Sequence, residues 1–227
     1  MSNDLENLIG QVPIFSSLSQ ADRDLLVREA TCRKLDEGDW VAHYGDVWPY
    51  LFIVETGAIT ALKESSGGRS LLVARFDPGE VFWGLAFFLE DAPTPAGLIA
   101  SEASKIHLWS RDVLLPILLE NGAMSWELTL LMVRRMLLAS KIVEGLAFQP
   151  VAGRLASWLL DKYAQTDGDL VSRDVTLDEM AAHIGTTREM VCRALYRFAE
   201  DGAVQINRTE FKISDSAILE RYTAKSR

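Results

Sequence analysis

The stretch TLDEMAAHIGTTREMVCRALYR, residues 176–197, constrains the fold of this chain more than any other. It predicts two short helices joined by a tight turn, because Ile184-Gly185 supplies a corner at which glycine can reverse the chain. Each helix begins with a Thr-x-x-Glu pattern typical of a capping box, formed by Thr176 with Glu179 and by Thr186 with Glu189. The segment is therefore predicted to be a helix-turn-helix.

The second of these helices has an apolar face and a charged face. Its apolar residues are spaced at i, i+3, i+4 and i+7 and predict one buried stripe, made of Val191, Ala194, Leu195 and Phe198. Glu189, Arg193 and Arg197 recur every four residues on another face, with Arg188 beside them at the N-terminal end. Fork-shaped polar side chains at the front of a second helix suit the reading of bases in the major groove. The alternative is a solvated face on an ordinary helix pair that does not bind DNA.

The charge of the whole chain argues against an extended, non-specific nucleic-acid binder. Over 227 residues the formal net charge is −9, with 48% apolar and 24% charged residues. This composition is typical of a soluble globular protein large enough to bury a core. A negatively charged molecule can still read DNA sequence-specifically if its positive charge is confined to one surface. The arginines of the second helix meet that condition.

Cysteine content and apolar patterning favour a cytoplasmic protein that has no membrane attachment. Cys32 and Cys192 are the only cysteines, too few for a Cys₄ zinc site or an iron–sulfur cluster within one chain. They are expected to be free thiols. No basic segment followed by an apolar run opens the sequence, so no signal peptide is predicted. Apolar runs are interrupted by charges or proline before they reach the length of a membrane span.

The first 121 residues change from a helical pattern to a two-residue alternation. Ser19 is expected to cap a helix that starts near Ala21, after an apolar anchor at residues 13–15. Turn residues then recur about every ten positions, which is typical of a β-sandwich or barrel. The segments between them are predicted strands: 51–54, 58–62, 70–76, 97–100 and 105–109. The first two are expected to pair as a hairpin.

Residues 122–147 return to a helical pattern and predict one long helix. Spacings of three and four connect an apolar seam typical of a coiled coil, made of Thr129, Met132, Met136, Ala139, Val143 and Leu146. A second apolar stripe lies beside it, made of Leu128, Leu131, Leu138 and Ile142. One stripe can pack on the β domain and the other on a partner chain. This predicts a parallel homodimer through Met132, Met136, Ala139 and Val143; the alternative is a single helix buried on two sides.

The C-terminal part is predicted to be helical around the helix-turn-helix and to end in a hairpin. Proline suits the first turn of a helix, so residues 150–165 form a separate helix, and a polar turn follows at 166–169. Gly202 ends the second helix of the pair and is expected to cap it. Beyond it, residues 204–206 and 211–213 are predicted to form a two-stranded wing around a turn at 207–209.

Taken in order, these segments resemble the Crp/Fnr superfamily of bacterial transcription regulators over nearly the whole chain. The resemblance is carried by Gly79-Glu80-Val81-Phe82, Arg134-Arg135, Leu146-Ala147-Phe148, Gly153-Arg154-Leu155-Ala156, and Gly185-Thr186-Thr187-Arg188-Glu189 with Arg193. It implies an α+β fold. A cyclic-nucleotide-binding-like β-roll sensor domain would span 1–121, a dimerisation helix 122–147, and a winged helix-turn-helix domain 148–227.

The resemblance also implies what the chain binds. Its DNA-binding residues would be Thr187, Arg188, Glu189, Arg193 and Arg197. Arg188, Glu189 and Arg193 match the Arg-Glu-x-x-x-Arg reading set of the cyclic-AMP receptor proteins, in which Arg pairs with guanine and Glu accepts from cytosine. A homodimer on double-stranded DNA is therefore expected, reading a TGTGA-like palindrome. RNA polymerase would be a further partner if the protein is an activator.

The family's ligand-binding residues do not carry over. Cyclic-AMP binders place a glutamate on the ribose, an Arg-Ser pair on the phosphate and a Thr-Ser pair near the adenine. At those positions this chain has Gly84, Thr94-Pro95 and Ala139-Ser140. A phosphate buried without its arginine would leave an uncompensated charge, so cyclic AMP is not the expected effector. The iron–sulfur branch is excluded because its N-terminal cysteine group is missing.

An apolar effector pocket is expected instead, lined by Phe82, Trp83, Leu85, Phe87, Ala139 and Ser140; the alternative is that the aromatic residues are simply core. The three histidines are candidate haem or metal ligands, and His107, in a strand near the pocket wall, is the best placed of them. His43 is expected at the surface and His183 within the helix-turn-helix. No metal site is predicted. Cys192 could report oxidation from within the recognition helix, although an ordinary small helix residue is the simpler interpretation.

Nothing in the sequence indicates an enzyme. A Walker loop, a nucleophile elbow and a paired-histidine motif are all missing. The expected function is that of a sequence-specific DNA-binding transcription regulator controlled by an effector other than cyclic AMP. The alternative is a small-molecule or haem-based sensor whose helix-turn-helix contacts proteins rather than DNA.

Overall fold

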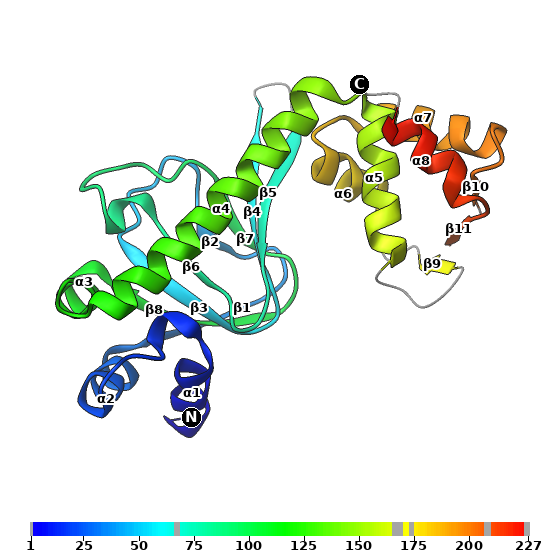
Figure 1. Cartoon of the computed structure of the whole chain (residues 1–227). Helices are drawn as coiled ribbons and strands as arrows, with labels where there is room; N and C mark the ends of the chain where they lie inside the picture. Colours follow the sequence, from blue (N-terminus) through cyan, green and yellow to red (C-terminus); the bar gives the residue numbers. More distant parts are fainter. Residues whose placement is uncertain (1, 66–68, 165–169, 173–174, 207–209, 225–227) are drawn as a thin grey trace. The chain divides into compact units, whose positions relative to one another are not determined.

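The computed structural model describes residues 2–65, 69–164, 170–172, 175–206 and 210–224. The chain divides into two compact units: residues 1–63 with 73–137, and residues 64–72 with 138–227. The first unit holds the β-strands that follow the N-terminal helices, and the second holds the helix-turn-helix (Figure 1). This is the α+β organisation that the sequence predicted.

The first unit combines short N-terminal helices, two sheets and further helical segments, and part of strand β5 belongs to the second unit. The helical elements are α1 (Ser2–Gln11), η1 (Pro13–Phe15), α2 (Gln20–Glu29), η2 (Leu85–Phe87), α3 (Arg111–Glu120) and the long α4 (Gly122–Phe148), which continues into the second unit. The strands are β1 (Thr31–Leu35), β2 (Trp40–Ala42), β3 (Tyr50–Thr56), β4 (Ile59–Glu64), β5 (Ser70–Phe76), β6 (Val81–Trp83), β7 (Gly97–Ala100) and β8 (Ser104–Ser110).

These strands form two four-stranded sheets, and the hairpin predicted between residues 51–54 and 58–62 is wrong. One sheet has the order β1-β8-β3-β6 and the other β2-β7-β4-β5, so β3 and β4 belong to different sheets. The chain passes from one sheet to the other at Gly57, which has a φ of 75°. Two residues connect β3 and β4. A connection of this length is typical of a hairpin, so nothing in the sequence indicated that the two strands belong to different sheets.

Strand β3 separates two hydrophobic cores. Side chains alternate across a strand, and Leu51 and Ile53 face a core built with α1, α2 and α3, while Phe52 and Val54 face the space between the two sheets. All four are fully buried. The continuous apolar run of this strand therefore reflects burial on both faces.

The N-terminal helices are fixed on the outer face of the β1-β8-β3-β6 sheet. Ser19 caps α2 as predicted, since its hydroxyl accepts a hydrogen bond from the Asp22 amide at 3.2 Å. The indole of Trp109, on β8, donates to the Leu26 carbonyl near the end of the same helix at 2.8 Å, and Phe15 packs edge-on against that indole. Because the indole N–H is buried, this bond is needed to avoid an unsatisfied donor.

Helix α4 is partly buried at its start and apolar on its exposed surface beyond. Met124 and Leu128 are buried, and Leu131 and Met132 pack against the same core. Farther along, the exposed large apolar residues are Val133, Met136, Leu137, Leu138, Val143, Leu146 and Phe148. None of the helices in the described part of the chain is both long and apolar enough to span a bilayer.

The second unit holds the helices and the three-stranded sheet of the C-terminal part. Its elements after α4 are α5 (Val151–Ala164), β9 (Leu170–Ser172), α6 (Leu177–Ile184), α7 (Arg188–Glu200), β10 (Val204–Ile206), β11 (Glu210–Ile213) and α8 (Ser216–Ala224). Strands β10 and β11 form the predicted hairpin, but β11 also pairs with β9, which the sequence pattern did not reveal. The predicted turns at 207–209 and 166–169 lie outside the described residues.

Gly57 generates a stability prediction. A Cβ added there would lie 2.3 Å from Ser104 Oγ and 2.4 Å from the Ala103 carbonyl oxygen, whereas at Gly38, also with positive φ, a Cβ meets nothing within 4 Å. We expect Gly38→Ala to lower the free energy of unfolding by about 1–2 kcal/mol through backbone strain. Gly57→Ala should cost at least about 2 kcal/mol more, because the backbone must also shift. Urea denaturation of both variants measures the difference, and equal losses would show that the close approach at Gly57 is easily relieved.

Candidate nucleic-acid interface and effector pocket

Helix α6 is capped at both ends, and its C-terminal cap forms the corner with α7. At the start of α6, Thr176 and Glu179 form the predicted capping box: the Thr176 amide donates to the Glu179 carboxylate at 2.6 Å, and the Glu179 amide donates to the Thr176 hydroxyl at 3.2 Å. At its end, Gly185 has a φ of 63°, and the Thr186 amide donates to the Ala181 carbonyl. This left-handed glycine cap turns the chain directly into α7.

The predicted capping box of Thr186 with Glu189 is wrong by one residue. Thr187 is the N-cap of α7, and its hydroxyl accepts from the Met190 amide at 3.4 Å, while Thr186 is buried. Two consecutive threonines offer the same capping chemistry. Burial of the first, after the Gly185 cap, leaves the second to cap the helix.

The apolar stripe of α7 holds the helix against the rest of its unit, as predicted. Val191, Ala194, Leu195 and Phe198 are all buried. They pack in one core with residues of α5, α6 and α8. The opposite face of α7 is consequently left to solvent.

Three charged residues stand at the exposed N-terminal end of α7. The side chains of Arg188, Glu189 and Arg193 are each between 64% and 70% exposed. Arg188 pairs with Asp178 of α6 at 3.0 Å, and Arg193 pairs with Glu189 one turn earlier. Exposed ion pairs such as these contribute at most about 1 kcal/mol. The two carboxylates therefore orient the guanidinium groups of Arg188 and Arg193 but bind them only weakly.

Arg197 differs from these three. Its guanidinium lies over the ring of Tyr222, 5.3 Å from the ring centroid. The Tyr222 hydroxyl also hydrogen-bonds the Asp201 carboxylate, and burial together with this bond raises the pKa of Tyr222. Arg197 thus helps to pack α8 onto the end of α7. Cys192, on the same helix, is half-buried.

Arg154 supports the corner from α5, a role that the sequence did not reveal. Its Nε donates to the Ile184 carbonyl at 2.8 Å and its Nη1 to the Gln149 carbonyl at 2.7 Å. Burial lowers the pKa of this guanidinium. The arginine satisfies a carbonyl at the end of α6, where helices leave carbonyls unpaired. The position was visible in the sequence as part of the Gly153-Arg154-Leu155-Ala156 motif.

In the β domain, the position of the family's ribose-binding glutamate is closed by packing. A Cβ built on Gly84 would lie 1.9 Å from the Trp48 carbonyl oxygen and 2.8 Å from its ring. Thr94, at the position of the phosphate-binding arginine, is 2% exposed, and its hydroxyl has no partner among the described residues. Gly84 has no side chain and the Thr94 hydroxyl is neutral, so neither position offers the charged contact that pairs strongly with a phosphate.

The expected aromatic pocket divides between the two cores. Phe82 lies with Trp48, Phe52 and Phe76 between the sheets, its ring centroid 4.6 Å from that of Phe76. Trp83 and Phe87 pack on the opposite face with the N-terminal helices. Leu85 is 38% exposed, and Ala139 and Ser140 are exposed on α4. The aromatic residues therefore do not line one common cavity, since successive β6 residues point to opposite faces.

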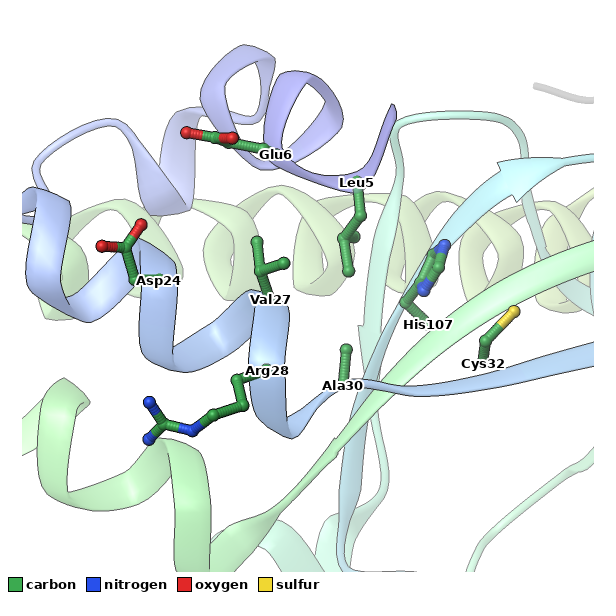
Figure 2. Close-up of a pocket in the computed structure, with 8 residues that line it drawn as sticks. All are labelled: Leu5, Glu6, Asp24, Val27, Arg28, Ala30, Cys32 and His107. Carbon is green, nitrogen blue, oxygen red and sulfur yellow. The ribbon is translucent and has the colours of Figure 1, made fainter. Parts of the chain in front are cut away.

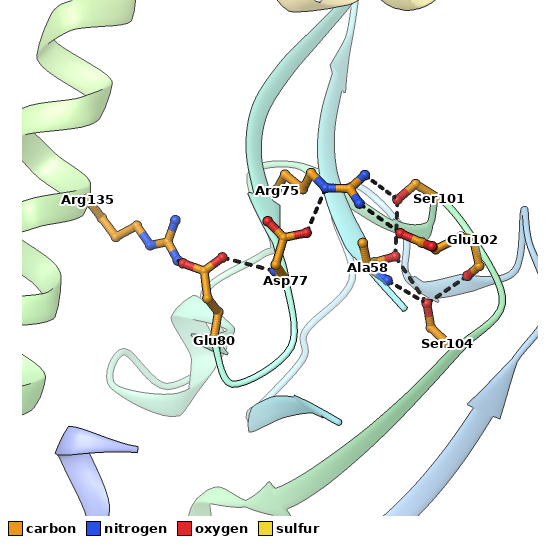
Figure 3. Close-up of polar contacts among 8 residues, drawn as sticks. All are labelled: Ala58, Arg75, Asp77, Glu80, Ser101, Glu102, Ser104 and Arg135. Atoms are coloured by element: carbon orange, nitrogen blue, oxygen red, sulfur yellow. Dashed lines mark hydrogen bonds and ion pairs between the residues drawn. The ribbon is translucent and has the colours of Figure 1, made fainter. Parts of the chain in front are cut away.

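Three arginines of this domain are engaged by other groups, and Figure 3 shows two of them, Arg75 and Arg135, with their carboxylate partners. Arg75 pairs with Asp77 and Glu102, both at 2.8 Å; burial opposes the effect, but these carboxylates raise the pKa of Arg75. Arg111 donates to the Phe87 carbonyl. Arg135 of α4 pairs with Glu80 at 3.1 Å and stacks 4.7 Å above the Phe76 ring. Sequence reasoning did not identify Arg135 as a link between α4 and the β domain.

The three histidines lie in different environments. His43 is exposed and stacks on Trp40, and His183 packs against Trp158. His107 is buried on β8, with its Nε2 2.5 Å from the Glu55 carboxylate. In the part of the chain that the structure describes, no three His, Cys, Asp or Glu residues gather as a metal would require.

Comparison with known proteins agrees with this two-unit organisation. Residues 32–121 match the cyclic nucleotide-binding domain and residues 153–222 the Crp-like helix-turn-helix domain. The chain is 27% identical over 208 residues to the cyclic AMP receptor protein of Thermus thermophilus, covering 92% of this chain and 95% of that one. It is 24% identical over 222 residues to a CRP-like cAMP-activated global transcriptional regulator of Mycobacterium tuberculosis, covering 96% and 99% of the two chains. A crp/fnr-family transcriptional regulator from Eubacterium rectale shares the fold with a TM-score of 0.78 at 19% identity, covering 93% and 98%.

A nucleotide-binding-type β domain joined by a long helix to a capped helix-turn-helix defines a class of DNA-binding transcription regulators rather than enzymes. Within that class, this chain belongs to the Crp/Fnr family. Members of the family bind DNA as dimers.

Proposed function

We propose that this regulator acts in the cytoplasm as a homodimer that reads a TGTGA-like palindrome and responds to an effector other than cyclic AMP. The observation that carries the DNA part is the exposed set of Arg188, Glu189 and Arg193 at the front of a helix whose other face is buried. A helix presented in this way can enter a major groove without disturbing its own core.

The chemistry of the three side chains fits the proposed half-site. Arginine can donate two hydrogen bonds to O6 and N7 of guanine, and a glutamate can accept from the amino group of cytosine. Thr187, as the cap of α7, would orient the first turn and bring its backbone amides towards a phosphate. Arg197 is committed to Tyr222, so we assign it a supporting role in the packing of α8 rather than base reading.

The first test of DNA reading removes each arginine in turn. Arg188→Ala or Arg193→Ala should weaken binding to a TGTGA palindrome by about 1–3 kcal/mol at fixed salt and affect random DNA much less. Arg221→Ala, an exposed arginine on α8, is the matched control and should leave specificity unchanged. Electrophoretic shifts on both DNAs measure the ratio. Equal loss on specific and random DNA would assign these arginines to phosphates, and no binding by the wild type would favour the protein-contact alternative.

The proposed dimer rests on the exposed apolar surface of α4. Val133, Met136 and Val143 follow spacings of three and seven and are between 41% and 65% exposed, and Ala139 is also exposed. Met132, which the sequence assigned to the seam, packs against the chain's own core, so we give it a smaller share of the interface. An apolar stripe of this length facing water is typical of an interaction surface. A second copy of α4 would cover it with the heptad geometry of a parallel pair.

A charge placed in this seam tests the dimer. Val143→Asp would bury like charges across the two-fold axis, and we expect both the dimer and specific DNA binding to be lost at micromolar protein. Lys141→Asp, exposed and about 160° away around the helix from Val143, is the control and should remain dimeric. Light scattering gives the mass of each variant. A Val143→Asp protein that stays dimeric would disprove this seam.

The proposed choice of effector rests on charge. Affinity for a cyclic nucleotide in this fold needs a cation on the phosphate, because an unpaired buried anion is costly. Thr94 supplies one neutral hydroxyl and Pro95 no backbone donor, and Arg75 and Arg111 already have partners. The regulator would thus differ in its signal from the Thermus thermophilus and Mycobacterium tuberculosis relatives, one named as a cyclic AMP receptor and the other as cAMP-activated.

Calorimetry with cyclic AMP and cyclic GMP tests this difference. We expect no heat of binding up to millimolar nucleotide and no change in the intrinsic tryptophan fluorescence, to which Trp83 contributes. The Thermus thermophilus cyclic AMP receptor protein, titrated in parallel, confirms that the nucleotide is active. Micromolar binding of either nucleotide, accompanied by higher DNA affinity, would contradict the proposal.

A further inference from the structure

A hollow of about 510 Å³ lies between the N-terminal helices and the outer face of the β1-β8-β3-β6 sheet. It is lined by residues of α1, α2, β1 and β8 together with the residue that joins α2 to β1: Leu5, Glu6, Asp24, Val27, Arg28, Ala30, Cys32 and His107. Figure 2 shows that Leu5 and Val27 point towards one another from the two helices, with His107 and Cys32 side by side at one end. None of these residues contributes to the DNA-reading surface.

His107 is the one buried polar side chain of this hollow. It is a cross-strand partner of Cys32, and its side chain is 6% exposed. Its Nε2 is bonded to Glu55, whereas its Nδ1 is buried and has no hydrogen-bond partner among the described residues. A buried polar atom without a partner is costly. Because His107 lines a hollow, a bound ligand could supply the hydrogen bond that its Nδ1 lacks.

The surroundings of Glu55 determine what His107 offers to such a ligand. Lys105 also pairs with the Glu55 carboxylate, at 2.7 Å. Burial raises the pKa of Glu55, but the hydrogen bonds from Lys105 and His107 outweigh it and lower that pKa overall. The ionised carboxylate accepts the Nε2–H of His107. In the neutral imidazole the Nδ1 is then an acceptor, and the ring to which it belongs lines the hollow.

The rest of the hollow is apolar at its wall and acidic at its rim. Leu5, Val27 and Ala30 supply aliphatic surface. Glu6 and Asp24 stand on α1 and α2, and the Gln20 amide donates to both, at 3.2 and 3.0 Å, which ties the two helices together at the rim. Arg28 also lines the hollow, but it pairs with Glu29 at 3.0 Å. The Glu6 and Asp24 carboxylates therefore leave an excess of negative charge at the rim, which disfavours an anion.

We propose that this hollow binds a small, largely apolar molecule with one hydrogen-bond donor, a hydroxyl or an amine, whose donor bonds Nδ1 of His107 while its apolar body packs on Leu5, Val27 and Ala30. The site is separate from the closed region around Gly84 and Thr94, and it is independent of whether the protein reads the proposed DNA palindrome. A ligand here would join α1 and α2 to the sheet and stabilise the N-terminal helices.

The test compares three probes that share a ring and differ in their donor. Phenol carries a hydroxyl, benzylamine a charged amine, and toluene neither. Each is titrated into the full chain while the ring nitrogens of His107 and His43 are followed by two-dimensional ¹H–¹⁵N NMR. We expect phenol or benzylamine to bind about five- to tenfold more tightly than toluene, the ratio that one hydrogen bond provides. The Nδ1 resonance of His107 should move at saturation, and those of exposed His43 should not.

Two variants distinguish the contribution of the His107 hydrogen bond to probe binding from that of the volume of the hollow. Leu5→Trp fills the hollow and should abolish saturable binding of all three probes. His107→Leu removes the acceptor and should make phenol, benzylamine and toluene bind alike; circular dichroism checks that it folds. If phenol alone or benzylamine alone binds, the result identifies the donor as a hydroxyl or an amine. The proposal is overturned if the wild type binds neither phenol nor benzylamine saturably, if toluene binds as tightly, or if Leu5→Trp binds unchanged.

Discussion

The burial of β3 on both faces is the constraint on which the N-terminal unit depends. Leu51 and Ile53 face the helices, and Phe52 and Val54 face the second sheet, so the β1-β8-β3-β6 sheet must be covered twice. The N-terminal helices and α3 cover the outer face of this sheet. Without them, each Å² of apolar surface exposed to water would cost about 25 cal/mol of free energy. Trp109 fixes that layer by a hydrogen bond to Leu26. On β8, Ile106 and Leu108 face the space between the sheets. His107 lies between them in sequence and therefore faces the helices, because side chains alternate along a strand.

Local patterns in the sequence predicted the elements better than their partners. Ser19, Thr176 and Gly185 act as expected, because a cap depends on residues three or four positions away. The pairing of β3 was not predictable in the same way. Alternation of apolar residues states which side chains share a face but not which strand lies beside them. Strand β9 was not predicted for a related reason: it is three residues long and pairs with β11 at the end of the sheet, and three residues are too few to establish a period.

The candidate sites were predictable to the extent that they are made of exposed side chains on regular elements. The apolar stripe predicted which residues of α7 are buried. It thereby also predicted that Arg188, Glu189 and Arg193 lie on the exposed face. The pocket was harder, since Phe82 and Trp83 are adjacent in sequence but belong to different cores. Close contacts such as Trp48 on Gly84 join segments distant in sequence and leave no local signal. The free Nδ1 of His107 likewise depends on Glu55, 52 residues away.

The ion pairs on α6 and α7 bear on how an acidic protein can discriminate between DNA sequences. Arg188 and Arg193 are neutralised by Asp178 and Glu189 in the free chain, and these acids would repel a phosphate that approached without a matching base. The pairs are exposed, so breaking them costs at most about 1 kcal/mol each. A bidentate contact with guanine contributes about 1–3 kcal/mol and can replace either pair, whereas a single phosphate contact gains less and meets the nearby carboxylates. Residues 149–227 contain 11 Lys and Arg against 12 Asp and Glu, so this part of the chain as a whole attracts DNA weakly. Under the proposed function, affinity therefore comes mainly from the few positions at which an arginine exchanges its carboxylate for a base.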